Sequence, residues 1–230
     1  MNLGLKDRVY IVTAASKGLG RATAQALIDD GAKVVVSSRS AEGIAKAVTE
    51  LGEHNAVGIA VDNADPSAPA QLIQAANDNF GRLDGALISV GGPPAGAIVD
   101  KTDDEWRGAF ETVFLGGLRL ATSVAAELGD GGSIVFVLST SVKQPISGLS
   151  ISNGLRPGLA MAAKTLADEL GPRGIRVNGL LPGRIDTERV RELDALSEDP
   201  KTARAQGAAA IPLRRYGEPA EFGRVASFLL

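Results

Sequence analysis

Close to its start the chain reads Val9-Tyr10-Ile11-Val12-Thr13-Ala14-Ala15-Ser16-Lys17-Gly18-Leu19-Gly20-Arg21, an apolar run followed by a loop of small residues and a helical pattern. Such a loop lets backbone N–H groups approach a pyrophosphate, and the helix after it aims its unpaired N–H groups and its dipole at the same anion. The stretch therefore predicts the floor of a dinucleotide site. Gly18 and Gly20 would also suit a tight strand-to-helix turn that binds nothing, so other parts of the sequence are needed to distinguish the two interpretations.

Short β-branched runs alternate with longer helical patterns along the whole chain. Because each right-handed crossover between parallel strands needs a helix, this alternation predicts an α/β fold with a doubly wound parallel sheet, Rossmann-like and covered on both faces. Ligands of such sheets bind at the carboxyl ends of the strands, beside the switch in strand order, where the loop of residues 13–20 would lie. We expect strands at 9–12, 33–38, 57–61, 85–90, 133–138 and 175–180, and helices at 21–30, 41–52, 69–80, 103–128 and 152–170.

Composition narrows the function classes. The 230 residues are 44% hydrophobic and 22% charged, which suits a single domain over residues 1–230. A net charge of −3 and an aromatic content of 4% argue against binding nucleic acid. The chain has no cysteine, which excludes disulfides and thiolate metal sites, and we expect no metal site of another kind. No uninterrupted apolar run is long enough to span a bilayer, so we expect a cytoplasmic protein with no membrane partner.

Residues 184–212 are charged, mixed and less regular than the rest, with a break at Glu198-Asp199-Pro200. In an enzyme this segment would be a lid over the substrate. Equally, it could be a helical excursion on the surface, and the sequence leaves both open.

Several motifs, in order along essentially the whole chain, resemble those of the short-chain dehydrogenases/reductases, and within that family the 3-oxoacyl-(acyl carrier protein) reductase-like branch. The loop at 13–20 is similar to the family's Thr-Gly-x-x-x-Gly-x-Gly, with Ala14 at the first glycine, which a negative φ would make tolerable. Asp62-Asn63 follows the third expected strand, and residues 182–187 follow the sixth. The resemblance implies cofactor contacts from Thr13, Ser16, Lys17, Gly18, Leu19, Gly20, Ser38, Arg39, Asp62, Asn63, Gly91, Pro182, Gly183, Ile185 and Thr187.

The cofactor can be chosen on chemical grounds. A carboxylate at the end of the second strand would bind the ribose hydroxyls of NAD and repel the 2′-phosphate of NADP. This chain has Ser37-Ser38-Arg39 there, and Lys17 adds a second cation. Because a guanidinium offers a planar fork of donors to a phosphate, we expect NADP(H), with NAD(H) as the alternative. Arg39 and Lys17 could also be solvated surface cations.

The catalytic positions depart from the family. The resemblance implies a tyrosine that donates a proton, a lysine four residues later, a serine thirteen residues earlier and a helix asparagine. This chain has Ser152 for the tyrosine, Arg156 for the lysine, Ser139 for the serine with Ser141 as the alternative, and Phe114 for the asparagine. A serine hydroxyl is a poor proton donor, and arginine cannot act as an acid, although it could bind a carboxylate or a developing alkoxide. These residues could also merely cap and solvate a helix.

Two functions from different classes follow. The first is an NADP(H)-dependent oxidoreductase acting on a small-molecule carbonyl or alcohol, with a 3-oxoacyl thioester as one candidate and Ser139, Ser152 and Arg156 in the site. The second is a catalytically inert dinucleotide-binding protein that acts as a sensor or partner subunit. Family members continue past Leu230 into another strand, so we expect six strands with that last strand missing. We also expect a homodimer or homotetramer through the long helices around 105–128 and 152–170.

Overall fold

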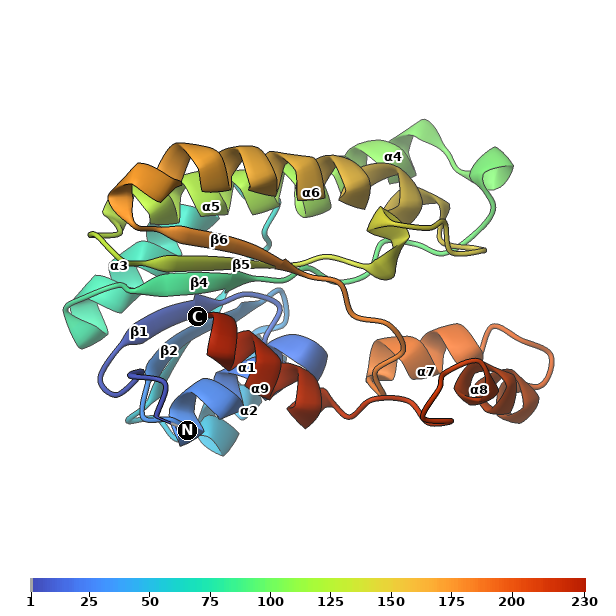
Figure 1. Ribbon diagram of the computed structural model, residues 1–230, viewed down its shortest axis with the longest axis horizontal. Coiled ribbons are helices and arrows are strands. Elements are labelled where there is room, and N and C mark those ends of the chain that lie inside the picture. The colour runs from blue at the N-terminus through green and yellow to red at the C-terminus, as the bar shows by residue number, and fades with distance from the viewer. Residues whose placement is uncertain (1) are drawn as a thin grey trace.

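A computed structural model describes residues 2–230 and shows a six-stranded parallel sheet in the order β3-β2-β1-β4-β5-β6 (Figure 1). This confirms the predicted α/β doubly wound sheet. The expected strand bounds differ from the observed ones by at most two residues. The strands are β1 Val9–Val12, β2 Lys33–Ser38, β3 Ala56–Ala60, β4 Gly85–Ile88, β5 Ser133–Val137 and β6 Arg176–Leu180.

Helices cover both faces of this sheet (Figure 1). One core lies between the sheet and α3, α5 and α6, and includes Leu72, Val124 and Leu159. The other lies between the sheet and α1, α2 and α9, and includes Leu27, Ile44 and Phe222. Burial of these two aliphatic layers supplies the main free energy of folding. The helices are α1 Gly18–Asp29, α2 Ala41–Leu51, α3 Ala68–Phe80, α5 Gly116–Glu127, α6 Ser150–Leu170 and α9 Pro219–Leu229.

The strand order reverses between β1 and β4. From β1 the chain winds outward to β2 and β3, then returns to pair β4 with the other side of β1 before continuing to β5 and β6. The loops after β1 and β4 therefore diverge at the carboxyl edge of the sheet. This is the crevice in which doubly wound sheets bind their ligands.

The helix expected at 103–128 is continuous in outline but has three parts. α4 (Asp103–Ala109) leads into a π-helical turn (Phe110–Leu115) and then into α5. Single π-helical turns occur frequently at functional sites. By length and composition the run Asp103–Glu127 could cross a membrane. In the fold, however, α5 packs against α3 and β4 and adds Leu120 and Val124 to a core, which is the position of an internal helix.

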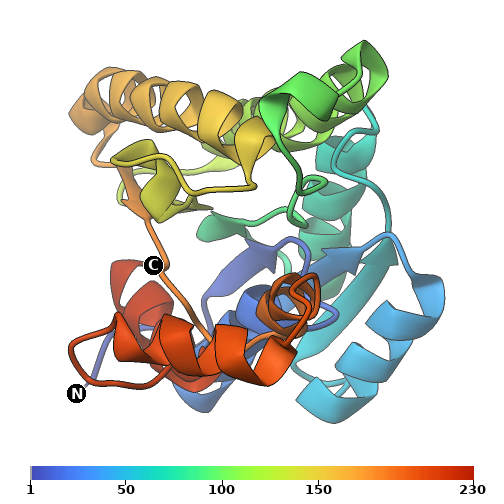
Figure 2. The same ribbon diagram turned by 90° about the vertical axis from the view of Figure 1, so that its right-hand side faces the viewer.

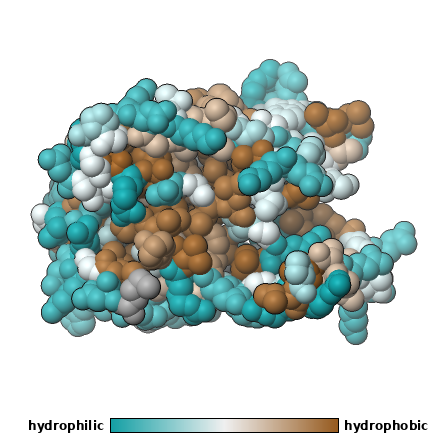
Figure 3. Space-filling model, viewed as in Figure 1, coloured by the Kyte–Doolittle hydropathy of each residue, from teal (hydrophilic) through white to brown (hydrophobic). Residues whose placement is uncertain are grey.

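The edge of the sheet at β6 is uncovered. Within the described residues β6 pairs with β5 alone, as the last strand in the order of the six-stranded sheet. Hydrophobic residues gather across the face that carries β6 and the end of α9 (Figure 3). Val225 and Phe228 of α9 are 51% and 61% exposed.

Residues 184–212 form two helices, α7 (Glu188–Asp194) and α8 (Pro200–Ala209), which stand apart from the sheet (Figure 1). Turned by 90°, the molecule shows this pair facing the end of α6, with the carboxyl edge of the sheet between them (Figure 2). The segment thus lies where a lid would lie.

Candidate functional site

A cleft of about 1450 Å³ opens at the switch in strand order. Its walls come from the loops after all six strands, from α4 and the π-helical turn, from the start of α6 and from α7. Every predicted site residue except Thr13 lines this one cleft. The fold therefore brings together residues that lie up to 171 positions apart, from Ser16 to Thr187.

The N-terminus of α1 forms the floor. This helix begins at Gly18, three residues earlier than expected, because Gly18-Leu19-Gly20 is its first turn and not a loop. Among the described residues no side chain caps it. A Cβ on Gly20 would lie 2.6 Å from the carbonyl oxygen of Ala14, so only glycine lets the helix approach the loop this closely. The N–H groups of this turn remain for an anion in the cleft.

Ala14 corrects one expectation. Its φ is +49°, in the left-handed region, and not negative as tolerance of alanine would require. The backbone therefore keeps the conformation that the family's glycine would adopt, and the alanine carries the strain, of roughly 1–2 kcal/mol for an L-residue.

Thr13 holds the cleft together without lining it. It is fully buried. Its hydroxyl donates to the carbonyl oxygen of Ser89 and accepts the Ser89 N–H at 2.9 Å. The Asn63 side-chain amide donates to the same Ser89 oxygen at 3.0 Å. Thr13 was predicted to contact the cofactor; the structure places it beneath the surface, where it joins the loops after β1 and β4.

The end of the cleft beyond β2 carries exposed polar groups. Ser38 is the last residue of this strand and Arg39 follows it, with its side chain 76% exposed. Its Nε lies 4.0 Å from an Asp62 carboxylate oxygen. An ion pair this open is held weakly, so Arg39 is free to turn to a phosphate.

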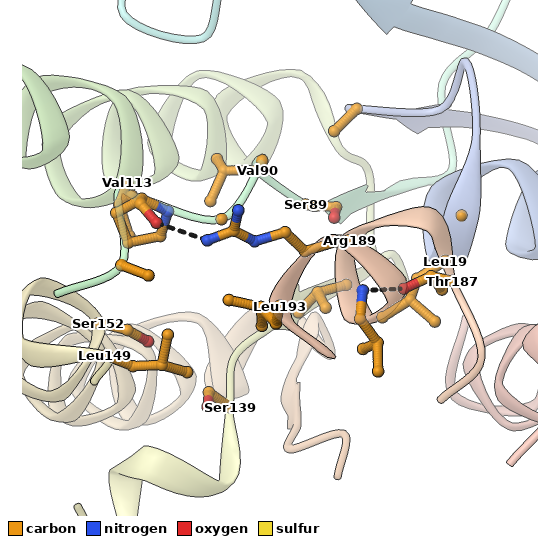
Figure 4. Close-up of a pocket in the computed structure, with 18 of the residues that line it drawn as sticks. Leu19, Ser89, Val90, Val113, Ser139, Leu149, Ser152, Thr187, Arg189 and Leu193 are labelled. Atoms are coloured by element: carbon orange, nitrogen blue, oxygen red, sulfur yellow. Dashed lines mark hydrogen bonds between the residues drawn. The ribbon is translucent and has the colours of Figure 1, made fainter. Parts of the chain in front are cut away.

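The segment of residues 184–212 contacts both sides of the cleft. Pro182, Gly183 and Ile185 lead into it, and Thr187 caps α7 and lies 3.7 Å from a Cβ built on Gly18. Arg189 of α7 reaches across and donates to the carbonyl oxygen of Pro93 at 2.8 Å (Figure 4). On the other side Lys17 lies 3.9 Å from Glu192. These contacts place α7 over the cleft.

Hydroxyl groups gather at the opposite end. Ser139 and Ser152 lie on one side of the cleft with Leu149, and Leu193 of α7 faces them (Figure 4). Ser139 Oγ accepts the N–H of Ser141 at 3.1 Å. Ser141 and Ser152 are both buried. The row of hydroxyls can donate to or accept from a polar ligand, while Val90, Val113 and Leu149 supply apolar walls.

Arg156 lies one helical turn after Ser152 and is 6% exposed. Its Nη1 donates to the carbonyl oxygen of Val137 at 2.7 Å. Burial lowers the pKa of its guanidinium to about 10, which leaves it charged at neutral pH. Phe114 does not line the cleft; it stacks on Phe110 at 5.1 Å between ring centroids and packs against Gly158.

Comparison with known proteins assigns the family. A family model described as enoyl-(acyl carrier protein) reductase matches residues 13–230. Human dehydrogenase/reductase SDR family member 4 is 34% identical over 98% of this chain and 81% of its own. The chain belongs to the short-chain dehydrogenase/reductase family.

Two further members of the short-chain dehydrogenase/reductase family are similar over nearly the same length. The 3-oxoacyl-[acyl-carrier-protein] reductase FabG of Salmonella typhimurium is 30% identical over 99% of this chain and 91% of its own. The L-sorbose reductase of Gluconobacter frateurii, solved with NADPH and L-sorbose, is 27% identical with a TM-score of 0.92, covering 100% of this chain and 91% of that chain. The chain is thus an oxidoreductase homologue throughout.

Neither tyrosine of this short-chain dehydrogenase/reductase lines the cleft. Tyr10 is sealed in β1, and its hydroxyl donates to the carbonyl oxygen of Leu230. Tyr216 lies buried under the lid, where its hydroxyl bonds to Asp194 and Arg184 and where burial raises its pKa. Both phenol groups are thus held by contacts within the fold, away from the cleft.

Sequence reasoning missed the residues that α7 brings to the site. Arg189, Glu192 and Leu193 carry no motif, and the Pro93 oxygen that Arg189 binds is 96 positions away. Only the tertiary position of the lid reveals their contacts.

Proposed function

We propose that this protein is an NADP(H)-dependent oxidoreductase that transfers hydride between the cofactor and a carbonyl or alcohol substrate at an atypical catalytic site. The observation that carries the proposal is the uncapped, glycine-built N-terminus of α1, which opens on a 1450 Å³ cleft at the switch in strand order. Membership of the short-chain dehydrogenase/reductase family supports it.

The residues fit a dinucleotide along the whole cleft. The first turn of α1 would hold the pyrophosphate, Asp62 and Asn63 the adenine end, and Pro182, Gly183, Ile185 and Thr187 the nicotinamide end. Arg39 and Ser38 would hold the 2′-phosphate, and the NADPH in the L-sorbose reductase structure supports this preference. When bound, the cofactor supplies or accepts the hydride.

In this proposal Ser152 and Arg156 occupy the positions of the family's tyrosine and lysine. Ser139 and Ser152 would hydrogen-bond the substrate oxygen and orient its carbonyl. Because a serine hydroxyl is far less acidic than a phenol, water admitted to the cleft would supply the proton, and reduction would be slow compared with a site that has a tyrosine. A 3-oxoacyl thioester is a first candidate substrate, supported by the Salmonella relative.

One observation favours a second function, that of a catalytically inert dinucleotide-binding protein. Within the described residues neither tyrosine lines the cleft, so a phenolic proton donor is lacking there. A protein that binds the dinucleotide and acts as a sensor or partner subunit would need no such donor.

Thermal denaturation separates these possibilities. We expect millimolar NADPH to raise the melting temperature, and to raise it more than NADH does. If neither nucleotide raises it, both functions are wrong. If NADPH binds tightly but is not oxidised with any member of a broad panel of aldehydes, ketones, 3-oxoacyl thioesters and oxo acids, the inert dinucleotide-binding protein is the correct function.

A further inference from the structure

Five cationic side chains line the cleft, and one of them differs from the rest. Four lie within 4.0 Å of a carboxylate: Lys17 of Glu192, Arg39 of Asp62, Arg184 of Asp194 and Arg189 of Glu192. Arg156 is the most buried of the five, and within residues 2–230 it has no acidic partner at that distance. A buried charge without a counter-charge is strongly unfavourable, so this guanidinium calls for an anion.

The remaining donors of Arg156 open toward the cleft. One nitrogen, Nη1, is used by the Val137 carbonyl oxygen. In the described chain, the buried side-chain atoms that are sealed from solvent and have no hydrogen-bond partner are Arg21 Nε and Ser37 Oγ. The other nitrogens of Arg156 are therefore not sealed inside the protein, and the residue lines the cleft. Donors remain on this side chain for a ligand in the cleft.

Five carboxylates line the same cleft, and in the described chain none of them lies within 4.0 Å of Arg156. Asp104 pairs with Arg107 at 3.0 Å, and Glu105 pairs with Lys101 at 2.8 Å. Asp194 pairs with Arg184 at 2.8 Å. Each of these carboxylates already has its own cation. Asp62 lies 4.0 Å from Arg39, and Glu188, at the start of α7, is not within 4.0 Å of Arg156. An anionic ligand in the cleft would supply the counter-charge that these acids do not.

Cofactor phosphates do not suit this position. The features that favour phosphates are the N-terminus of α1 and Arg39, which follow β1 and β2. Arg156 instead lies on α6 beside β5, on the other side of the switch in strand order. A ribose hydroxyl could accept a hydrogen bond from it but would leave its charge unbalanced. The substrate is the remaining source of the anion.

We propose that Arg156 binds a carboxylate of the substrate, so that the substrates are oxo acids and the corresponding hydroxy acids. The planar guanidinium suits a carboxylate because two N–H groups can bond its two oxygens. Ser152, one helical turn before Arg156, and Ser139 then lie beside the carbonyl that undergoes reduction. This inference rests on the proposed oxidoreductase function and narrows its substrate class.

The test compares a carboxylate with a neutral ester or thioester of the same oxo acid. Acetoacetate is compared with the N-acetylcysteamine thioester of the same 3-oxo acid, and 2-oxobutyrate with its methyl ester, each titrated calorimetrically into the NADP⁺ complex. Because NADP⁺ cannot donate hydride to a ketone, the readout is binding alone. We expect the carboxylate member of at least one pair to bind at least 10-fold more tightly, and Arg156→Gln to abolish that preference by weakening the binding of the carboxylate member.

Arg156→Lys is the control for misfolding, because it retains the positive charge and should retain part of the preference for the carboxylate. Equal binding of both members in every pair, no binding by any oxo acid of a two- to six-carbon panel, or an unchanged preference in Arg156→Gln would overturn the inference. Failure of NADP⁺ itself to bind the wild-type protein would instead refute the proposed function.

Discussion

The hydroxyl oxygens of Ser141 and Ser152 lie 3.4 Å apart, and either can donate to the other. One belongs to the turn after β5 and the other to the first turns of α6, so the pair joins the two elements that frame the inner end of the cleft. Since both side chains are buried, the contact is a fixed part of the site. A more acidic side chain at position 152 would also have the Ser141 hydroxyl as a neighbour.

The first prediction concerns the tyrosine and lysine that the family resemblance implies at positions 152 and 156. The double variant Ser152→Tyr with Arg156→Lys should reduce neutral ketones and 3-oxoacyl thioesters roughly 10²-fold faster than the wild type, the low end of what general acid catalysis contributes. NADPH oxidation measured by absorbance checks this. Ser152→Ala, which removes the hydroxyl without adding a phenol, should show no gain. No increase in a folded, NADPH-binding double variant would mean that another group limits the rate.

The second prediction concerns Ala14. Since its φ is +49°, Ala14→Gly should relieve strain of about 1–2 kcal/mol, offset by about 0.4–1 kcal/mol of extra chain entropy in the unfolded state. We expect a net gain of up to ~1.6 kcal/mol in the free energy of unfolding by urea. Ala15→Gly is the matched control; Ala15 is fully buried without a positive φ, and its variant should be less stable by roughly 1 kcal/mol. Equal losses in both variants would show that Ala14 is unstrained.

Much of this fold could be predicted from local pattern. The strands are short aliphatic runs, and their alternation with helices is sufficient to specify a doubly wound sheet, so the crevice after β1 could be expected as well. The glycine spacing at 18–20 also predicts a site, because the backbone itself forms it. The predicted start of α1 was wrong by three residues, because small residues suit both a loop and the first turn of a helix.

The rest depends on contacts between distant segments. The φ of Ala14 follows from the loop's packing against α1, and the burial of Thr13 follows from its bonds to Ser89, 76 positions away. Similarly, the contact of Arg189 with the Pro93 carbonyl oxygen depends on where α7 packs in the fold. The resemblance to the family implies Arg156 as a site residue, but not as a cation without an acidic partner, because that is a property of the whole cleft.

Cofactor choice gives the third prediction. Arg39→Leu should weaken NADPH binding roughly 10-fold or more and leave NADH binding unchanged, because one charge-assisted hydrogen bond contributes about 1.5–3 kcal/mol. Fluorescence titration of each nucleotide measures this. Lys46→Leu serves as the control, since Lys46 is exposed on α2, pairs with Glu50 and does not line the cleft. If the NADPH to NADH ratio is the same in Arg39→Leu and the wild type, Arg39 is a solvated surface cation.

Self-association is the fourth prediction. We propose a dimer through the helical run Asp103–Glu127 and α6, where Phe110 and Met161 are 40% and 61% exposed. Light scattering at micromolar concentration should give twice the chain mass, and Met161→Glu should shift it toward the monomer because a charge would be buried at the interface. Leu213→Glu, at a 74% exposed residue of the segment after α8, should leave the dimer intact. A wild-type monomer would contradict the proposal.

The last prediction follows Glu221 at the start of α9. Its two oxygens accept from the Arg215 guanidinium at 2.7 and 2.9 Å, and one also accepts the Glu218 N–H. The Arg215 contact first, and then the backbone N–H, lowers the pKa of Glu221 from 4.5 to about 2. A carboxyl whose pKa is lower in the folded state stabilises the fold above its unfolded pKa, and this contribution is lost as the pH falls from 4.5 toward 2. Wild type should therefore exceed Glu221→Gln in free energy of unfolding at pH 6, with the difference shrinking through pH 4 and 3; a constant difference would show that the carboxylate charge is not its source.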